Sequence, residues 1–293
     1  MFRVNENEDR LSVSPDGVLW IVLIGAIGAV VGSVPLWEFV PVSHVPGLVV
    51  GFSVVAGFVG AVSVTAGYLV VAVVAGRPVP SAVLSLLAYV LTGYVAAVVW
   101  HGFPADTPGW SAPKHVGRRI GRGVGAVTVG AVAGGVVLAW GYEIAGIRPF
   151  YLAPRYAASF WVAGLVVGLP VVSVSRYLSR IRVHPGSDMT GGSPLQGTQF
   201  SPVVVVVPLV WGVVGVIASV GYRAAGMLLM ADPDAFAMRN LSFLLVLYGD
   251  ETYGPGGRRV QAAFGGVMLV LLVLALLRAR PGSIRSRREG ETG

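Results

Sequence analysis

The stretch VQAAFGGVMLVLLVLALL, which covers residues 260–277, determines the class of this protein. Its 18 residues include no charged side chain, and at 1.5 Å of rise per residue such a helix approaches the ~30 Å thickness of the hydrocarbon layer. A helix satisfies its backbone hydrogen bonds within one segment, and the alternating pattern of a membrane β-barrel is absent. We therefore predict that residues 260–277 form a transmembrane helix.

The composition of the whole chain indicates the same class. Of its 293 residues, 55% are hydrophobic and 12% are charged, whereas soluble domains carry about 25% charged residues. Six further apolar stretches predict membrane helices, at residues 18–34, 47–74, 81–100, 123–146, 157–178 and 203–230. The predicted fold is all-α, a polytopic integral membrane helix bundle of about seven transmembrane helices, with six to eight also compatible with the hydropathy.

The basic residues predict how this bundle lies in the membrane. Twelve of the 21 Lys and Arg residues fall on the side of the 101–122 and 179–201 loops and the C-terminal tail. Basic loops stay in the cytoplasm, so we expect the N-terminus outside and the C-terminus in the cytoplasm. The net negative N-terminus does not fit a secretion signal. We expect three regions, an acidic tail at 1–17, a membrane domain at 18–280 and a basic disordered tail at 281–293.

Two stretches between the helices raise the question of a site. The segment GYEIAGIRPFYLAPRY, residues 141–156, places Glu143, Arg148 and Arg155 between two apolar stretches. These three residues either bind an anionic ligand at the outer mouth or anchor a turn at the headgroups, where an exposed ion pair adds little. The apolar residues 241–248 are too short to span, so they are predicted to be re-entrant or surface-lying.

Prolines inside two consecutive predicted helices indicate kinks. Pro170 and Pro208 each remove a backbone donor from a helix interior. Interrupted helices of this kind are found around the binding sites of transporters, although prolines are also common in membrane helices without such a role. We therefore treat both residues as candidates for the wall of a cavity.

The predicted inner loop at 101–122 ends in a cluster of basic residues. Lys114, Arg118, Arg119 and Arg122 are candidates for contact with anionic lipid or with a cytoplasmic partner subunit, and they also serve the topology. Pairs of glycines four residues apart favour close helix packing or a homo-oligomer interface. Five such pairs occur, at residues 28 and 32, 47 and 51, 121 and 125, 130 and 134, and 164 and 168.

The sequence lacks the motifs of most catalytic chemistry. It contains no cysteine, no HExxH, no GxSxG and no GxxxxGK[ST], so we expect no metal, no cofactor and no ATPase of its own. The lipid bilayer is the expected partner, and no nucleic acid is expected. The favoured function is a small-solute permease or the membrane subunit of a transporter, in a prokaryotic plasma membrane. A sensor or scaffold that binds a partner through the basic loops is the alternative, and an intramembrane lipid-modifying enzyme is a third reading.

Overall fold

The computed structural model describes residues 2–4, 11–13, 23, 25, 27, 44–102, 113–174, 201–231 and 255–278. Within these residues the secondary structure is helical, apart from two short antiparallel strands, β1 (Phe2–Val4) and β2 (Leu11–Val13). The pair lies in the segment expected to be an acidic tail, which the sequence pattern had not indicated as strand. Most of the first predicted helix, 18–34, and all of 241–248 lie outside the described residues.

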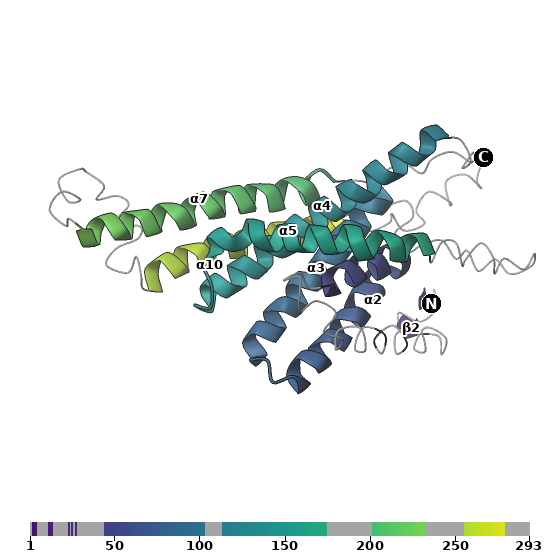
Figure 1. Cartoon of the computed structure of the whole chain (residues 1–293), viewed down its shortest axis with the longest axis horizontal. Coiled ribbons are helices and arrows are strands. Elements are labelled where there is room, and N and C mark those ends of the chain that lie inside the picture. The colour runs from purple at the N-terminus through teal and green to yellow at the C-terminus, as the bar shows by residue number, and fades with distance from the viewer. Residues whose placement is uncertain are drawn as a thin grey trace, which may run out of the picture.

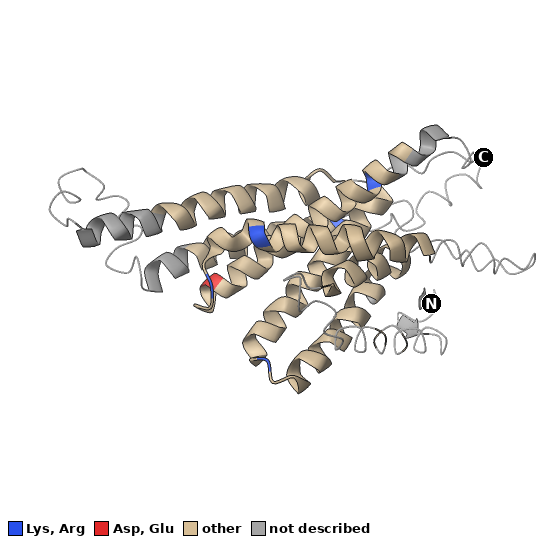
Figure 2. Ribbon diagram, viewed as in Figure 1, with Lys and Arg blue, Asp and Glu red and all other residues tan. Residues whose placement is uncertain are grey.

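Among the described residues, five helices are long and apolar enough to cross a membrane, as expected of a multi-pass membrane protein. They lie in α3 (Val79–Gly102), in α4 (Pro113–Ile144), in the segment Phe150–Val174, in α7 (Val203–Ala231) and in α10 (Pro255–Arg278). The segment Phe150–Val174 comprises η1 (Phe150–Leu152), α5 (Ala153–Ala163) and the π-helical turn η2 (Gly164–Gly168), followed by helix to residue 174. Figure 2 shows few charged residues in these helices, mostly near their ends.

The predicted helix 47–74 corresponds to α2 (Val45–Val74), which is not one straight helix. It consists of two apolar pieces, Val45–Phe58 and Gly60–Val74, and neither is long enough to cross a ~30 Å layer alone. In Figure 1 the hairpin of α2 and α3 is inclined to the direction of α5 and α7.

Two tight turns join consecutive helices, and a glycine makes each possible. Gly76 and Gly146 have φ of 72° and 68°, in the left-handed region that favours glycine. At the second turn the Ile147 amide donates to the Tyr142 carbonyl and the Gly146 amide donates to the Glu143 carbonyl. The same pattern of bonds occurs around Gly76. Both turns are therefore Schellman motifs that end one helix so that the next runs back beside it.

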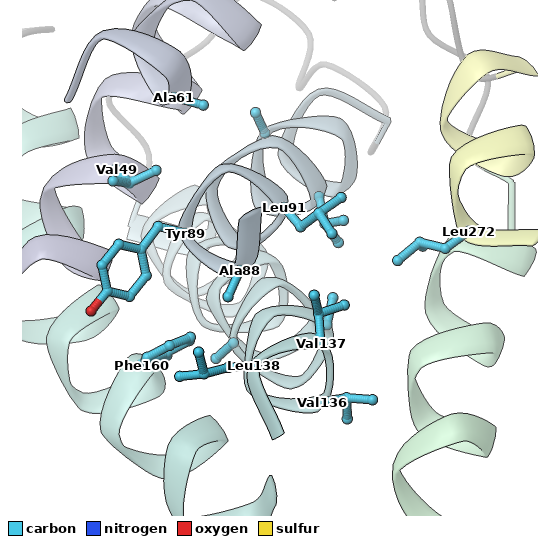
Figure 3. Packing of buried hydrophobic residues seen from close by; sticks show 14 of the residues in the cluster. Val49, Ala61, Ala88, Tyr89, Leu91, Val136, Val137, Leu138, Phe160 and Leu272 are labelled. Carbon is cyan, nitrogen blue, oxygen red and sulfur yellow. The ribbon is translucent and has the colours of Figure 1, made fainter. Parts of the chain in front are cut away.

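The core lies around α3 and α4. In the most apolar windows of these two helices 67% of residues are buried, compared with 28–33% in the segment Phe150–Val174, α7 and α10. Figure 3 shows side chains of α2, α3, α4 and α5 converging, with Leu272 of α10 pointing toward them. The outer helices therefore leave long apolar faces uncovered, as expected of surfaces that contact lipid.

Glycine pairs hold several of these helices at close range. Gly47 and Gly51 of α2 face Gly168 and the Ala163 carbonyl, leaving no room for a Cβ atom at either position. A Cβ atom at Gly130 or Gly134 of α4 would meet backbone of α3. Three of the five predicted pairs, 47 and 51, 130 and 134, and 164 and 168, therefore pack within the chain. The pair at 28 and 32 lies outside the described residues.

Candidate functional site

The break in α2 occurs at Gly57, inside the bundle. Gly57 is buried and has φ of 66° and ψ of −146°, a conformation open almost only to glycine. The chain turns so sharply that a Cβ atom on Gly60 would collide with the carbonyl of Phe52. The regular helix is thus interrupted between two apolar half-helices. In the hydrocarbon region of a membrane, backbone groups freed by such a break need partners from the protein or from a water-filled cavity.

A histidine from the neighbouring helix binds beside this break. The Nε2 atom of His101, on α3, lies 2.9 Å from the Val54 carbonyl oxygen. That carbonyl precedes the break by three residues, so its regular helical partner lies beyond Gly57. Because a carbonyl only accepts, Nε2 carries the hydrogen in this contact. His101 therefore supplies a donor where the backbone of α2 is interrupted.

A second group of polar atoms lies where α4, α7 and α10 meet. Trp211, Gly215 and Ser219 occur at intervals of four on α7, so they share one face of that helix. The side-chain amide Nε2 of Gln261, on α10, donates to the Gly215 carbonyl at 3.3 Å. Trp140 of α4 donates to the main-chain carbonyl of Gln261 at 3.0 Å. We call Trp211, Gly215, Ser219 and Gln261 the polar seam.

Three side-chain atoms of the polar seam are buried without a hydrogen-bond partner among the described residues. They are Nε1 of Trp211, Oγ of Ser219 and Oε1 of Gln261. Their residues are at most 2% exposed. An unpaired polar group in an apolar interior costs about 1–3 kcal/mol by mutational measurements. Such groups in a native bundle are candidates for ligand binding.

Glu143 lies in the last turn of α4, and the residue is 4% exposed. Its Oε2 atom accepts the backbone N–H of Phe150 at 2.5 Å, at the first residue of η1. The first amides of a helix lack partners within the helix, and a carboxylate satisfies one of them and opposes the positive end of the helix dipole. Glu143 therefore ties the end of α4 to the start of the next helix.

The two arginines predicted beside Glu143 lie differently. Arg148 and Arg155 are both exposed. Arg148 approaches the buried hydroxyl of Tyr156 without meeting the geometry of a hydrogen bond. The ring of Tyr156 packs edge-to-face on Tyr142, with centroids 5.8 Å apart. An anion site at these arginines stays a prediction.

The two predicted proline kinks fall in different surroundings. Pro208 is buried inside α7, whereas Pro170 is exposed, two residues after the π-helical turn η2. A π-turn accommodates a proline because it shifts the hydrogen-bond register around the missing donor. Whether both residues line one cavity stays a prediction.

Of the predicted basic cluster, Arg122 has described contacts. Its Nε atom donates to the Trp100 carbonyl near the end of α3, and its guanidinium lies 5.5 Å from the centre of the Trp100 ring. Lys114, Arg118 and Arg119 lie on α4 as well, but their side chains are outside the described part of the structure. Arg122 thus joins α4 to α3 near the predicted cytoplasmic side.

Sequence reasoning missed the break at Gly57 and the polar seam. It weighed prolines and ionisable residues, but the break is made by one glycine among 41, and the seam contains no charge. A signal was present for the seam, since Gln261 is the one amide side chain within the 260–277 stretch. Counting uncharged polar residues in apolar runs would have located it.

Comparisons with other proteins add no further assignment. No protein-family profile matches the chain, and no curated protein or solved structure is significantly similar to it. Within the described residues there is no group of three or more His, Asp or Glu side chains that could hold a metal ion.

Proposed function

We propose that this protein is a small-solute permease, or the membrane subunit of a transporter, without enzymatic activity. The observation that carries the proposal is the interrupted helix α2, with its break at the buried Gly57. Transporter binding sites typically lie where helices are broken at membrane depth, because freed backbone groups bind the solute or a coupling ion there. Irregular backbone at that depth is tolerated where protein buries it or a cavity solvates it.

The surroundings of the break support a functional role. His101 binds the Val54 carbonyl next to it, and Gly93 of α3 packs against Val49 and Ser53 of the first half-helix. The break is therefore held by its neighbours, and strain kept in place in this way is frequent at functional sites. We place the protein in the plasma membrane of a prokaryote. The sequence lacks a phosphate-binding loop, so a gradient or a partner subunit supplies the energy for any uphill movement.

The test compares two glycines that both have positive φ. Gly57→Ala strains the break, and Gly76→Ala, with φ of 72° and no neighbour within 4 Å, strains an exposed turn. Purified proteins are placed in vesicles, and uptake of labelled polyols, sugars, amino acids and sodium is measured. We expect uptake of at least one probe by the unmodified protein, loss of it in Gly57→Ala and retention in Gly76→Ala. Uptake that survives Gly57→Ala in full contradicts the proposal, as does a folded protein that moves none of the probes.

A sensor or scaffold is the second candidate, favoured by the start of α4. The helix begins at Pro113, whereas its membrane-spanning part begins at Ile120. A Cβ atom added at Gly117, Gly121 or Gly125 would meet no other described atom within 4 Å, so this side of the helix is open. A stoichiometric partner that copurifies with the unmodified protein, is lost with R118Q/R119Q and is found without solute uptake would favour this candidate.

A further inference from the structure

We propose that the polar seam binds a small uncharged molecule that carries both hydrogen-bond donors and acceptors, such as a short polyol. This inference rests on the proposed function and names the class of solute. The seam lies among α4, α7 and α10, and its members on α7 span two turns, or about 12 Å of helix. The ring of Phe150 covers it at Gly215, where a Cβ atom would collide with that ring.

The hydroxyl of Ser219 shows that the seam is arranged differently from the rest of the bundle. Hydroxyls in membrane helices usually donate to the carbonyl four residues earlier. Ser53, Thr92 and Ser173 do so here, onto Val49, Ala88 and Leu169. For Ser219 that acceptor is the Gly215 carbonyl, which instead receives the amide of Gln261. Gln261 thus takes the local acceptor, and the Ser219 hydroxyl has no partner among the described residues.

The chemistry of the three unpaired atoms indicates the ligand. Trp211 Nε1 only donates, Gln261 Oε1 only accepts, and Ser219 Oγ does both. A cation would call for carboxylates or several carbonyls, and an anion for a cationic or multiple-donor site. Phe150 separates the seam from Glu143, because its amide binds the carboxylate while its ring lies on Gly215. An alternating set of donors and acceptors without charge fits a molecule with hydroxyl or amide groups.

Because these three atoms are buried, apolar substitutions distinguish a role in solute binding from a role in stability. If the three atoms only cost stability, replacing them with apolar groups of similar shape leaves the fold as stable or more stable. If they bind solute, the same replacements reduce transport. Sites that sacrifice stability for function show these opposite effects.

The experiment measures the shrinkage and re-swelling of vesicles containing the full chain after addition of glycerol or urea. Ser219→Ala, Gln261→Met and Trp211→Phe are compared with Ser173→Ala, which removes a hydroxyl that donates to Leu169 on an exposed face. We expect each seam variant to slow glycerol or urea entry by about tenfold, the effect of one lost hydrogen bond to the passing molecule. The melting temperature of Ser219→Ala, which removes only an unpaired hydroxyl, should be unchanged or higher. Gln261→Met also loses the bond to the Gly215 carbonyl and Trp211→Phe loses part of a buried ring, so both should melt at a lower temperature. Ser173→Ala should behave as the unmodified protein. If Ser219→Ala fails to insert into the membrane, Trp211→Phe, which retains an aromatic ring, provides the measurement instead.

Each negative result in this experiment bears differently on the solute site and on the proposed function. Entry at the unmodified rate in all three seam variants overturns the inference, while the Gly57→Ala comparison still decides the proposed function. If the seam variants are less stable but admit glycerol or urea at the unmodified rate, the inference is also overturned, because the three seam atoms then contribute only to packing. If the unmodified protein admits neither glycerol nor urea, this inference fails. The proposed function fails only if the wider set of probes is also excluded.

Discussion

The single residue Glu143 shows how a charge is used at a membrane boundary. It was a candidate ligand-binding residue, and the structure gives its carboxylate a bond to the Phe150 amide. The bond is charge-assisted and buried, so it is stronger than an exposed ion pair in the headgroup region. The residue therefore holds the geometry of the turn, whatever else it binds.

Removing this acceptor should destabilise the turn in a graded way. Glu143→Ala leaves the buried Phe150 amide without this acceptor, at a cost of about 1–3 kcal/mol in the free energy of unfolding. Glu143→Gln keeps an oxygen and should cost less. Unfolding in mixed micelles, followed by circular dichroism during a titration with denaturing detergent, measures both. Equal losses in the two variants would show that the bond to Phe150 is not what the carboxylate contributes.

For the helices, hydropathy predicted where each one lies, but not how it is shaped. The predicted 81–100 and 203–230 correspond closely to α3 and α7, because long apolar runs have no other stable conformation in lipid. α4 begins ten residues before the predicted 123, since its basic first turns are not apolar. The break in α2 was not predicted, because the apolar pattern continues through Gly57 and only tertiary contacts determine which glycine bends.

The pairing of α3 and α4 depends on glycines that have no substitute. A Cβ atom on Gly134 would collide with the Thr92 side chain and lie 2.8 Å from the Ala88 carbonyl, whereas one on Gly125 meets nothing within 4 Å. We expect Gly134→Ala to lower the free energy of unfolding by about 1–3 kcal/mol through overpacking. Gly125→Ala, on the same helix, should be neutral or raise it by up to about 1 kcal/mol through helix propensity.

Thermal unfolding in detergent, read as loss of the monodisperse fraction, separates the two glycine variants. A destabilised Gly125→Ala variant would mean that this position contacts something beyond the described residues, such as a second copy of the chain. Gly121 and Gly125 formed one of the pairs predicted as a possible homo-oligomer face, so oligomeric state is measured in parallel. An equal effect of both substitutions would contradict the packing described for Gly134.

The turns at Gly76 and Gly146 should lie on the same, outer side of the membrane. α3 and α4 are each long and apolar enough to cross the membrane, and the connection between them is predicted to lie on the cytoplasmic side. The basic residues at 114–122 belong to that connection and to the start of α4, and positive charge there is expected to retain the connection in the cytoplasm. α3 then runs from the Gly76 turn toward the cytoplasm, and α4 runs back outward to the Gly146 turn. The two turns therefore lie on the same side of the membrane.

The absence of cysteine makes this orientation directly measurable, because every introduced thiol is the only one. Ala75→Cys and Ala145→Cys place it at exposed positions in the two turns, and Gly117→Cys places it at the exposed start of α4. In intact cells a membrane-impermeant maleimide should label the first two variants and should label Gly117→Cys only after lysis. Labelling of Gly117→Cys alone would reverse the predicted orientation. Labelling at only one of the two turns would mean that α3 or α4 does not cross, since two full crossings must return the chain to the side it left.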